Sequence, residues 1–290
     1  MSILVAVDGS ACAKVAVDWA ARVADRRNVP LRLVHVVTPG MVLWPELAVP
    51  PNFGQWEEKL AADILQKAAE VAEEAAPGVQ VHTEQIDGPS VTTLVDLSKE
   101  ASMIVVGSHG RSGLGRLILG SVSAGLVRHA HCPVAVIRDE DLAAPVPADA
   151  PVVVGIDGSP ASEKAIAIAF EEASWRNADL IVVHAVSDSD LVDVPRPDWD
   201  KLEQRGGEVL AERLAGWHER YPDVHVTRVV EWSRPANAIV KAGEQAQLIV
   251  VGSHGRGGFA GMLLGSVASA VVQAAKVPVI VARGDQSPDG

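Results

Sequence analysis

The chain has 290 residues, a formal net charge of −12 and two cysteines. This acidic balance excludes a general surface for nucleic acids or anionic membranes, and two cysteines are too few for a disulfide scaffold. The sequence begins with a strand-like apolar run without a basic leader, and no apolar run approaches membrane-spanning length. We therefore expect a cytoplasmic protein that neither binds nucleic acid nor inserts into membranes.

The first half of the chain alternates apolar runs of strand length with helix-like patterns. Val15, Trp19 and Val23 recur at every fourth position after an Asp-Gly-Ser turn, which is typical of a helix that packs on one side. Strands are predicted at residues 3–7, 31–36, 79–85, 103–106 and 134–137. Helices are predicted at residues 13–26, 55–75 and 122–129, with a short helix before the fourth strand.

The second half repeats this order of elements. Strands are predicted at residues 152–156, 180–186, 224–231, 248–251 and 279–282, and helices after Pro160 and at residues 200–220 and 267–276. Strands of almost continuous Val, Ile and Leu between helices indicate parallel strands buried on both faces. The predicted fold class is α/β: two tandem copies of an open, mostly parallel five-stranded sheet with helices on both faces, a Rossmann-like arrangement.

Sequence landmarks support a tandem duplication. The pattern Gly107-Ser108-His109-Gly110, followed by Gly120-Ser121, recurs 145 positions later, and the turn that begins at Asp8 recurs 149 positions later. The two copies therefore differ by four residues in length within the unit. We expect domains at residues 1–141 and 152–290, joined by an Ala- and Pro-rich linker at residues 142–151.

The glycine pattern lies between an apolar strand and a helix in both copies. Glycine allows the backbone to approach an oxygen atom closely, and the N–H groups at a helix start attract anions. Asp8 and Gly107, like Asp157 and Gly252, follow or end strands, and ligands of parallel sheets bind at the carboxyl ends of strands. An acidic side chain has no evident role in the fold at these strand ends. The sequence therefore predicts one anion-binding pocket in each domain.

The order of motifs in each half resembles the universal stress protein family. The resemblance rests on the aspartate after the first strand, the Val-His pair in the second, the spacing G-x2-G-x9-G-[ST], and a proline before the last strand. It covers both halves and is similar to tandem mycobacterial and actinobacterial members. Members with the intact glycine motif form the ATP-binding branch of the family, whose fold is that of the adenine nucleotide alpha hydrolases.

The resemblance implies a site that binds one ATP per domain, with or without Mg²⁺, and that needs no metal ligands of the protein. In the first domain Asp8 is expected beside the ribose or adenine, Val36 at the adenine, Val106 and Gly107 at the ribose, and Gly110, Gly120, Ser121 and Val122 at the phosphates. In the second domain the corresponding residues are Asp157, Ala185, Val251, Gly252, Gly255, Gly265, Ser266 and Val267.

The resemblance implies a regulatory or signalling protein of stress response or growth arrest. A slow ATP hydrolase or phosphoryl-transfer enzyme is an alternative, because His109 and His254 follow the glycine-loop strands and could act as acid or base. A scaffold in which the nucleotide is only structural is a third reading. No residue is predicted to be catalytic.

The family analogy also implies partners. We expect a homodimer and a protein partner that the sequence does not identify. The last strand of each domain is apolar and is expected at a sheet edge, where an exposed strand invites pairing. The two last strands are therefore predicted to pair with each other about a pseudo-two-fold axis, with both ATP sites facing away.

Other motifs carry less weight. Residues 255–260 match a relaxed dinucleotide fingerprint, but the first copy does not, and no acidic residue follows at the required distance. His129, His131 and Cys132 have no zinc-ligand spacing. His35 and His184 are expected to be core histidines with satisfied hydrogen bonds. The Pro-rich segments at residues 44–56 and 188–199 are predicted to be loops that either cover the adenine or simply pack.

Overall fold

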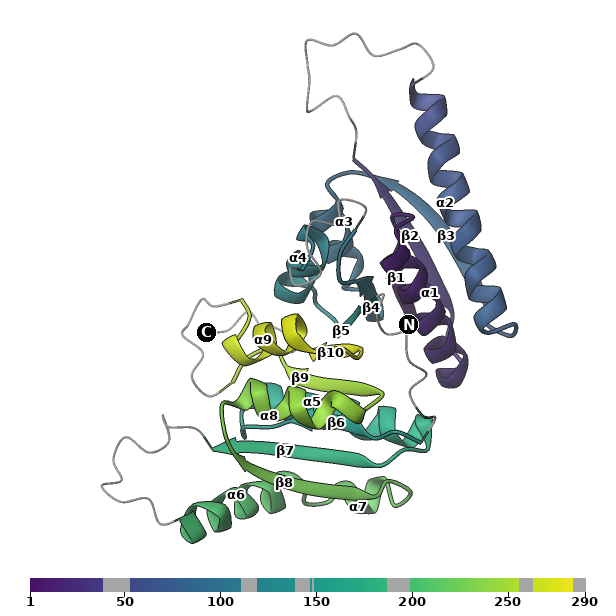
Figure 1. Ribbon diagram of the computed structural model, residues 1–290. Coiled ribbons are helices and arrows are strands. Elements are labelled where there is room, and N and C mark those ends of the chain that lie inside the picture. Colours follow the sequence, from purple (N-terminus) through teal and green to yellow (C-terminus); the bar gives the residue numbers. More distant parts are fainter. Residues whose placement is uncertain are drawn as a thin grey trace. The chain divides into compact units, whose positions relative to one another are not determined.

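The computed structural model describes residues 1–38, 53–110, 119–138, 147, 149–186, 199–255 and 263–283. The chain divides into two compact units, Met1–Asp139 and Glu140–Gly290. Each unit is an α/β layer structure (Figure 1), which confirms the predicted fold class. Most of the predicted loops at 44–56 and 188–199, and most of the linker at 142–151, lie outside the described residues. The loop bounds are wrong at their ends, because residues 53–56 and Trp199 belong to helices.

The first unit contains a five-stranded parallel sheet in the order β3-β2-β1-β4-β5. Its strands are β1 (Ser2–Ala6), β2 (Leu31–Val37), β3 (Val81–Asp87), β4 (Ala101–Gly107) and β5 (Val134–Ile137). Its helices are α1 (Ala11–Arg27), α2 (Phe53–Ala75), α3 (Ser90–Leu97) and α4 (Ser121–His129).

Successive strands are added to the sheet in one direction from β1 to β3 and in the other from β4 to β5, and this change determines which face each helix covers. The connections through α1 and α2 move outward from β1 to β3, whereas those through α3 and α4 move through β4 to β5. Since parallel crossovers are right-handed, the two pairs of helices cover opposite faces of the sheet. Accordingly α1 packs on α2 and α3 packs on α4 (Figure 1). A switch point of this kind opens a crevice at the carboxyl ends of β1 and β4.

The second unit repeats this topology with the strand order β8-β7-β6-β9-β10. Its strands are β6 (Val152–Gly155), β7 (Leu180–Val186), β8 (Val226–Trp232), β9 (Leu248–Gly252) and β10 (Val279–Ala282). Its helices are α5 (Pro160–Arg176), α6 (Trp199–Arg213), α7 (Trp217–Arg220), α8 (Pro235–Ala242) and α9 (Ser266–Ala274), with a 3₁₀ turn at Gly243–Gln245.

The prediction of one helix over residues 200–220 is wrong. The structure divides this segment into α6 and the one-turn helix α7, with Gly216 before α7 at a φ of 78°. An L-residue rarely adopts such a left-handed conformation, so the backbone cannot continue as a right-handed helix through Gly216. The apolar periodicity of the sequence continues across this break, which explains the error.

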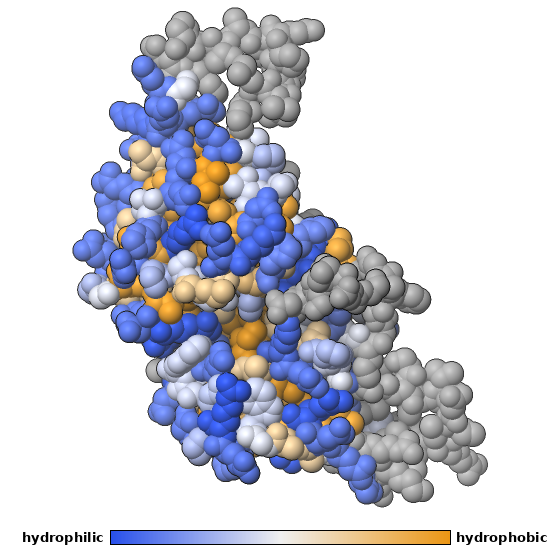
Figure 2. All heavy atoms as spheres, turned by 180° about the vertical axis from the view of Figure 1, so that it is seen from behind, coloured by the Kyte–Doolittle hydropathy of each residue, from blue (hydrophilic) through white to orange (hydrophobic). Residues whose placement is uncertain are grey.

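The core of each unit consists of the central strands and the helix faces that cover them. Ile3, Leu4 and Val5 of β1 and Val152 to Val154 of β6 are fully buried. On the face shown in Figure 2, the described residues are mostly hydrophilic, and hydrophobic side chains appear in small areas between them. Burial on both faces of the strands therefore accounts for the nearly continuous apolar runs in the sequence.

Candidate functional site

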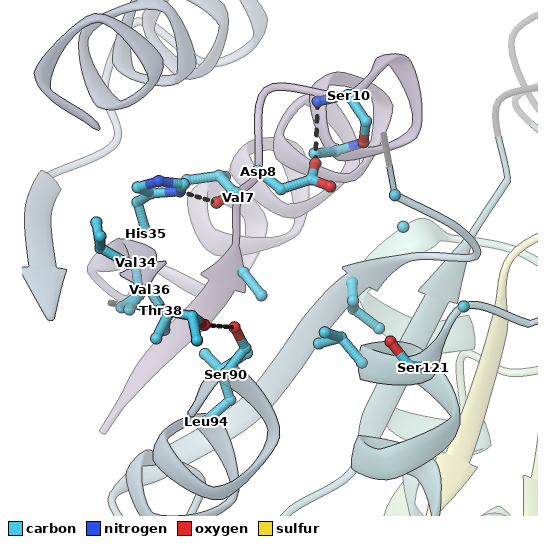
Figure 3. Close-up of a pocket in the computed structure, with 18 of the residues that line it drawn as sticks. Val7, Asp8, Ser10, Val34, His35, Val36, Thr38, Ser90, Leu94 and Ser121 are labelled. Carbon is cyan, nitrogen blue, oxygen red and sulfur yellow. Dashed lines mark hydrogen bonds between the residues drawn. The ribbon is translucent and has the colours of Figure 1, made fainter. Parts of the chain in front are cut away.

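A cavity of about 590 Å³ opens at the carboxyl ends of the strands in the first unit. Its walls include all eight residues predicted for the first site: Asp8, Val36, Val106, Gly107, Gly110, Gly120, Ser121 and Val122. They come from the ends of β1, β2 and β4 and from the start of α4. In Figure 3, Asp8 and Ser10 lie on one side of this cavity, Val36 on another and Ser121 across from them.

The cavity also has lining residues that were not predicted. These are chiefly Ser10, Thr38, Ser90 and Leu94, whereas Trp56, which also lines the cavity, ends the segment that was expected to cover the adenine or pack. Thr38 Oγ1 lies 3.3 Å from Ser90 Oγ, which connects the end of β2 to the start of α3 (Figure 3). Sequence patterns could not identify these residues, because serine, threonine and leucine are common and their distance from the glycine loop in the chain is large.

Asp8 has a structural role that the sequence analysis missed. The Ser10 N–H donates to Asp8 Oδ1 at 2.9 Å, and Ser10 Oγ in turn accepts from the Ala13 N–H at the start of α1. The turn between them is possible because Gly9 has a φ of 81°. The expectation that an acidic residue has no role in the fold at this strand end is therefore wrong: one carboxylate oxygen holds the turn that starts α1.

The other oxygen of Asp8 faces the glycine loop. A Cβ atom placed on Gly110 would lie 2.6 Å from Asp8 Oδ2, closer than van der Waals contact allows. Gly110 is therefore required for the loop to approach the carboxylate. The equivalent Cβ on Gly255 would lie 2.5 Å from Asp157 Oδ2, so the second unit has the same close approach.

His35 connects the second strand to the Asp8 turn. Its Nδ1 lies 2.7 Å from the carbonyl oxygen of Val7, the residue before Asp8, and the side chain is buried (Figure 3). Because a carbonyl only accepts, Nδ1 carries the proton in this contact. His184 makes the same contact to the Ile156 carbonyl at 3.0 Å. Both histidines are core residues with satisfied hydrogen bonds, as predicted.

The glycine loop is closed by its own backbone. The Gly120 N–H donates to the Ser108 carbonyl at 2.8 Å, and Ser123 Oγ donates to the same oxygen at 2.9 Å. The Gly120 N–H is therefore already used within the protein. Glycine at this position instead allows the two ends of the loop to lie close together, since a Cβ here would lie 3.2 Å from His109 Cα. The first amides of α4, at Ser121 and Val122, have no acceptor within their own helix and point toward its N-terminal end.

His109 is held on both ring nitrogens. Its Nδ1 lies 3.0 Å from Ser108 Oγ, and its Nε2 lies 3.4 Å from the sulfur of Cys12, a buried thiol. His109 lines the cavity, but a general acid or base needs a ring nitrogen that is available to the reacting group, and here both nitrogens lie within hydrogen-bonding distance of protein groups. The geometry thus favours a structural role for His109.

The second unit places its predicted residues at the same points of the fold. Ser159 N–H donates to Asp157 Oδ1 at 2.9 Å, and the Gly265 N–H donates to the Ser253 carbonyl at 2.7 Å. The other predicted residues lie at equivalent positions: Ala185 in β7, Val251 and Gly252 at the end of β9, Gly255 in the loop that follows, and Ser266 and Val267 at the start of α9.

Some positions differ between the units. Ala161 stands where the first unit has Cys12, and Ala268 where it has Ser123. The His254 ring still contacts Ser253 Oγ through Nδ1, at 3.1 Å. The loop histidine of the second unit is thus placed without a thiol contact from this position.

Fold and site together define a tandem parallel α/β protein with a cavity at the switch point of its first sheet. A model of the universal stress protein family matches residues 1–138 and again residues 150–283. The chain therefore belongs to the universal stress protein family, with two family domains in one polypeptide. Among the described residues, no helix is both long and apolar enough to cross a membrane.

Known proteins match this chain over almost its whole length. Universal stress protein Rv2623 of Mycobacterium tuberculosis is 51% identical over 286 residues, which is 98% of this chain and 96% of that protein. Universal stress protein Rv2005c of the same organism is 51% identical over 284 residues, 97% of this chain and 96% of that protein. The crystal structure of a universal stress protein from Archaeoglobus fulgidus has a TM-score of 0.71 at 23% identity, covering 97% of this chain and 98% of that one, and supports the fold.

Proposed function

We propose that each unit binds one ATP and that the protein acts as a regulatory or signalling module in stress response or growth arrest. The observation that carries the binding proposal is that all eight predicted residues of the first unit line one cavity. Its volume of about 590 Å³ is in the range of small-molecule sites. The physiological role is argued from family membership.

The chemistry of the cavity suits an adenine nucleotide. Its apolar side, with Val36, Val106 and Leu94, offers a surface for a flat base. The Asp8 carboxylate is an acceptor for a ribose hydroxyl, and the N-terminal end of α4 attracts phosphate oxygens through its amides and the Ser121 hydroxyl. Mg²⁺ would be held chiefly by phosphate oxygens and water, since such sites need few protein ligands.

Binding has better support than hydrolysis. An ATP hydrolase would need a group that orients or deprotonates water beside the phosphates. In the first unit His109, the candidate for this role, has both ring nitrogens within hydrogen-bonding distance of Ser108 and Cys12. We therefore infer that the nucleotide is a regulatory ligand that the protein binds, and not a substrate that it hydrolyses.

Two measurements test the proposal. Mass spectrometry of nucleotide released from freshly purified protein should detect ATP or ADP. Calorimetric titration of the nucleotide-free protein should give two ATP per chain. If neither released nucleotide nor ATP binding is detected in correctly folded protein, the proposal is wrong. A single-turnover assay with radiolabelled ATP should find hydrolysis no faster than in buffer.

A further inference from the structure

A buried hydroxyl links the two ends of the glycine loop in the first unit. Ser123, in the first turn of α4, is 2% exposed, and its Oγ lies 2.9 Å from the carbonyl oxygen of Ser108 and 2.9 Å from that of Gly120. Its single proton is donated to one of these acceptors or shared between them. Ser108 follows the end of β4 and Gly120 precedes α4, so one side chain holds the start of the loop against its end.

The second unit has the same backbone without this hydroxyl. Ala268 stands at the position of Ser123 and is equally buried, at 2% exposed. Gly120 and Gly265, which precede the two helices, have φ of −62° and −68° and ψ of 159° and 154°. The backbone hydrogen bonds that close the two loops, at 2.8 and 2.7 Å, are also alike. At this position the units therefore differ by one oxygen atom in matching surroundings.

The contacts of the loop histidines differ in the same direction. In the first unit the buried sulfur of Cys12 lies 3.4 Å from His109 Nε2. Ala161 replaces this cysteine in the second unit, where the Ser159 hydroxyl lies 3.4 Å from the His254 carbonyl. That O–H···O distance is longer than the usual range of about 2.5 to 3.0 Å, so this contact holds the second loop only weakly. These contacts, like the hydroxyl on α4, constrain the first loop more than the second.

Groups that are expected to receive the phosphates lie on both sides of this link. Gly110 lies two residues after its start, Ser121 and Val122 lie directly after its end, and all three line the cavity. The amides of a helix start bind an anion together with the loop only when both face it. A loop that is held in this arrangement before the ligand arrives loses less conformational freedom on binding, which raises affinity.

We propose that Ser123 is a positioning residue that holds the phosphate side of the first cavity in its binding conformation, and that the first unit therefore binds ATP more tightly than the second. This inference rests on the proposed function. One neutral hydrogen bond supports a difference of about two- to tenfold in affinity. The second unit, which has an alanine in this place, must order more of its loop when the nucleotide binds.

Each site is measured alone in the full chain. Gly265→Glu places bulk and negative charge where the phosphates of the second unit are expected and leaves the first site, whereas Gly120→Glu leaves the second. Calorimetry should find tighter ATP binding in Gly265→Glu than in Gly120→Glu. Equal affinities, or a tighter second site, would overturn the ranking of the two sites.

The role of the hydroxyl is tested with ATP and adenosine, which differ only in the phosphates. In the Gly265→Glu chain, adding Ser123→Ala should weaken ATP binding by about two- to tenfold and leave adenosine binding unchanged. A general loss of structure would weaken the binding of both ligands alike. Unchanged ATP affinity, or an equal loss for ATP and adenosine, would overturn the positioning role.

The reciprocal exchange provides the matched control. In the Gly120→Glu chain, adding Ala268→Ser supplies the second unit with the missing hydroxyl and should strengthen ATP binding by about two- to tenfold, again without changing adenosine binding. Circular dichroism verifies the fold of every variant. If Ser123→Ala does not fold, this exchange decides, and unchanged ATP affinity in it would overturn the positioning role.

Failure of this inference can be told apart from failure of the proposed function. Absence of ATP binding in the folded natural chain would refute the proposed function and this inference together. Unchanged affinities among chains that do bind ATP would refute this inference alone.

Discussion

Asp8 uses its two carboxylate oxygens for different purposes. Oδ1 accepts the Ser10 N–H, which starts α1, and Oδ2 faces Gly110 at the wall of the cavity. Under the proposed function, fold and ligand would both depend on this one side chain, and Asp157 has the same two contacts in the second unit. Substitutions can separate the two roles because an asparagine retains the Oδ1 acceptor but loses the charge.

We predict that Asp8→Ala weakens ATP binding in the first unit by about 1.5 to 3 kcal/mol and lowers the free energy of unfolding by about 1 kcal/mol. Asp8→Asn should weaken ATP binding while leaving the free energy of unfolding close to that of the natural protein. Calorimetry and thermal denaturation measure the two effects. Asp157→Ala is the matched control and should affect the other site. Normal ATP affinity in folded Asp8→Ala would remove this residue from the site.

A substitution at Gly120 provides a second test of the proposed site. A side chain here would lie against His109 Cα, and a glutamate would add negative charge where the phosphates are expected. Gly120→Glu should reduce the ATP stoichiometry from two per chain to one without unfolding the unit. Gly265→Glu should do the same in the second unit.

Gly207 provides the control for these glycine substitutions. A Cβ atom at Gly207 on α6 would meet nothing within 4 Å. Gly207→Glu should therefore retain both ATP molecules. Full stoichiometry in Gly120→Glu would show that the phosphates are bound elsewhere.

Among the elements, the break between α6 and α7 depends on backbone conformation. Gly216 has a φ of 78°, and no atom lies within 4 Å of a Cβ built there, so space is not the constraint. Gly216→Ala should lower the free energy of unfolding of the second unit by about 1 to 2 kcal/mol, because an L-residue is strained in this conformation. Urea denaturation measures the change.

The matched control is again on α6. Gly207 lies inside the helix in open space, so Gly207→Ala should raise the free energy of unfolding by up to about 1 kcal/mol through helix propensity. Opposite signs for the two glycine-to-alanine changes are the expected result. A stabilising Gly216→Ala would contradict the backbone explanation.

For the whole molecule, two compact units predict independent folding. Each unit has its own parallel sheet, core and glycine loop. Residues 1–141 and residues 152–290, expressed separately, should each unfold cooperatively and bind one ATP. Calorimetry on both fragments checks this. A fragment that folds but binds no ATP would mean that its site needs the other unit.

Association stays a prediction from the sequence. The expected homodimer, and the expected pairing of the last strands of the two domains, follow from the family analogy and from the cost of an exposed strand edge. Sedimentation of the purified chain measures the first. A disulfide engineered between residues 134–137 and 279–282 measures the second, and failure to form it in any register would contradict the pairing.

Sequence patterns alone determined the duplication and the α/β class, and together with the resemblance to the universal stress protein family they implied eight candidate residues in each domain. They could do so because strand and helix periodicities are local, and because the glycine spacing places a tight loop before a helix in each copy. Because the carboxyl ends of parallel strands lie at the same edge of a sheet, Asp8 and Gly107 are expected to lie near each other. The position of the cavity beside Asp8 could therefore be predicted from the sequence.

Only the tertiary structure decided what each of these groups contacts. The Ser108 carbonyl accepts the Gly120 N–H, and Cys12 contacts His109 across almost a hundred residues of chain. Arg213 forms an ion pair between α6 and α5 in the second unit, whereas the first unit has Ala68 at the equivalent position. Such contacts depend on distances between segments far apart in the chain. Local periodicity carries no information about those distances, and only the packed chain determines them.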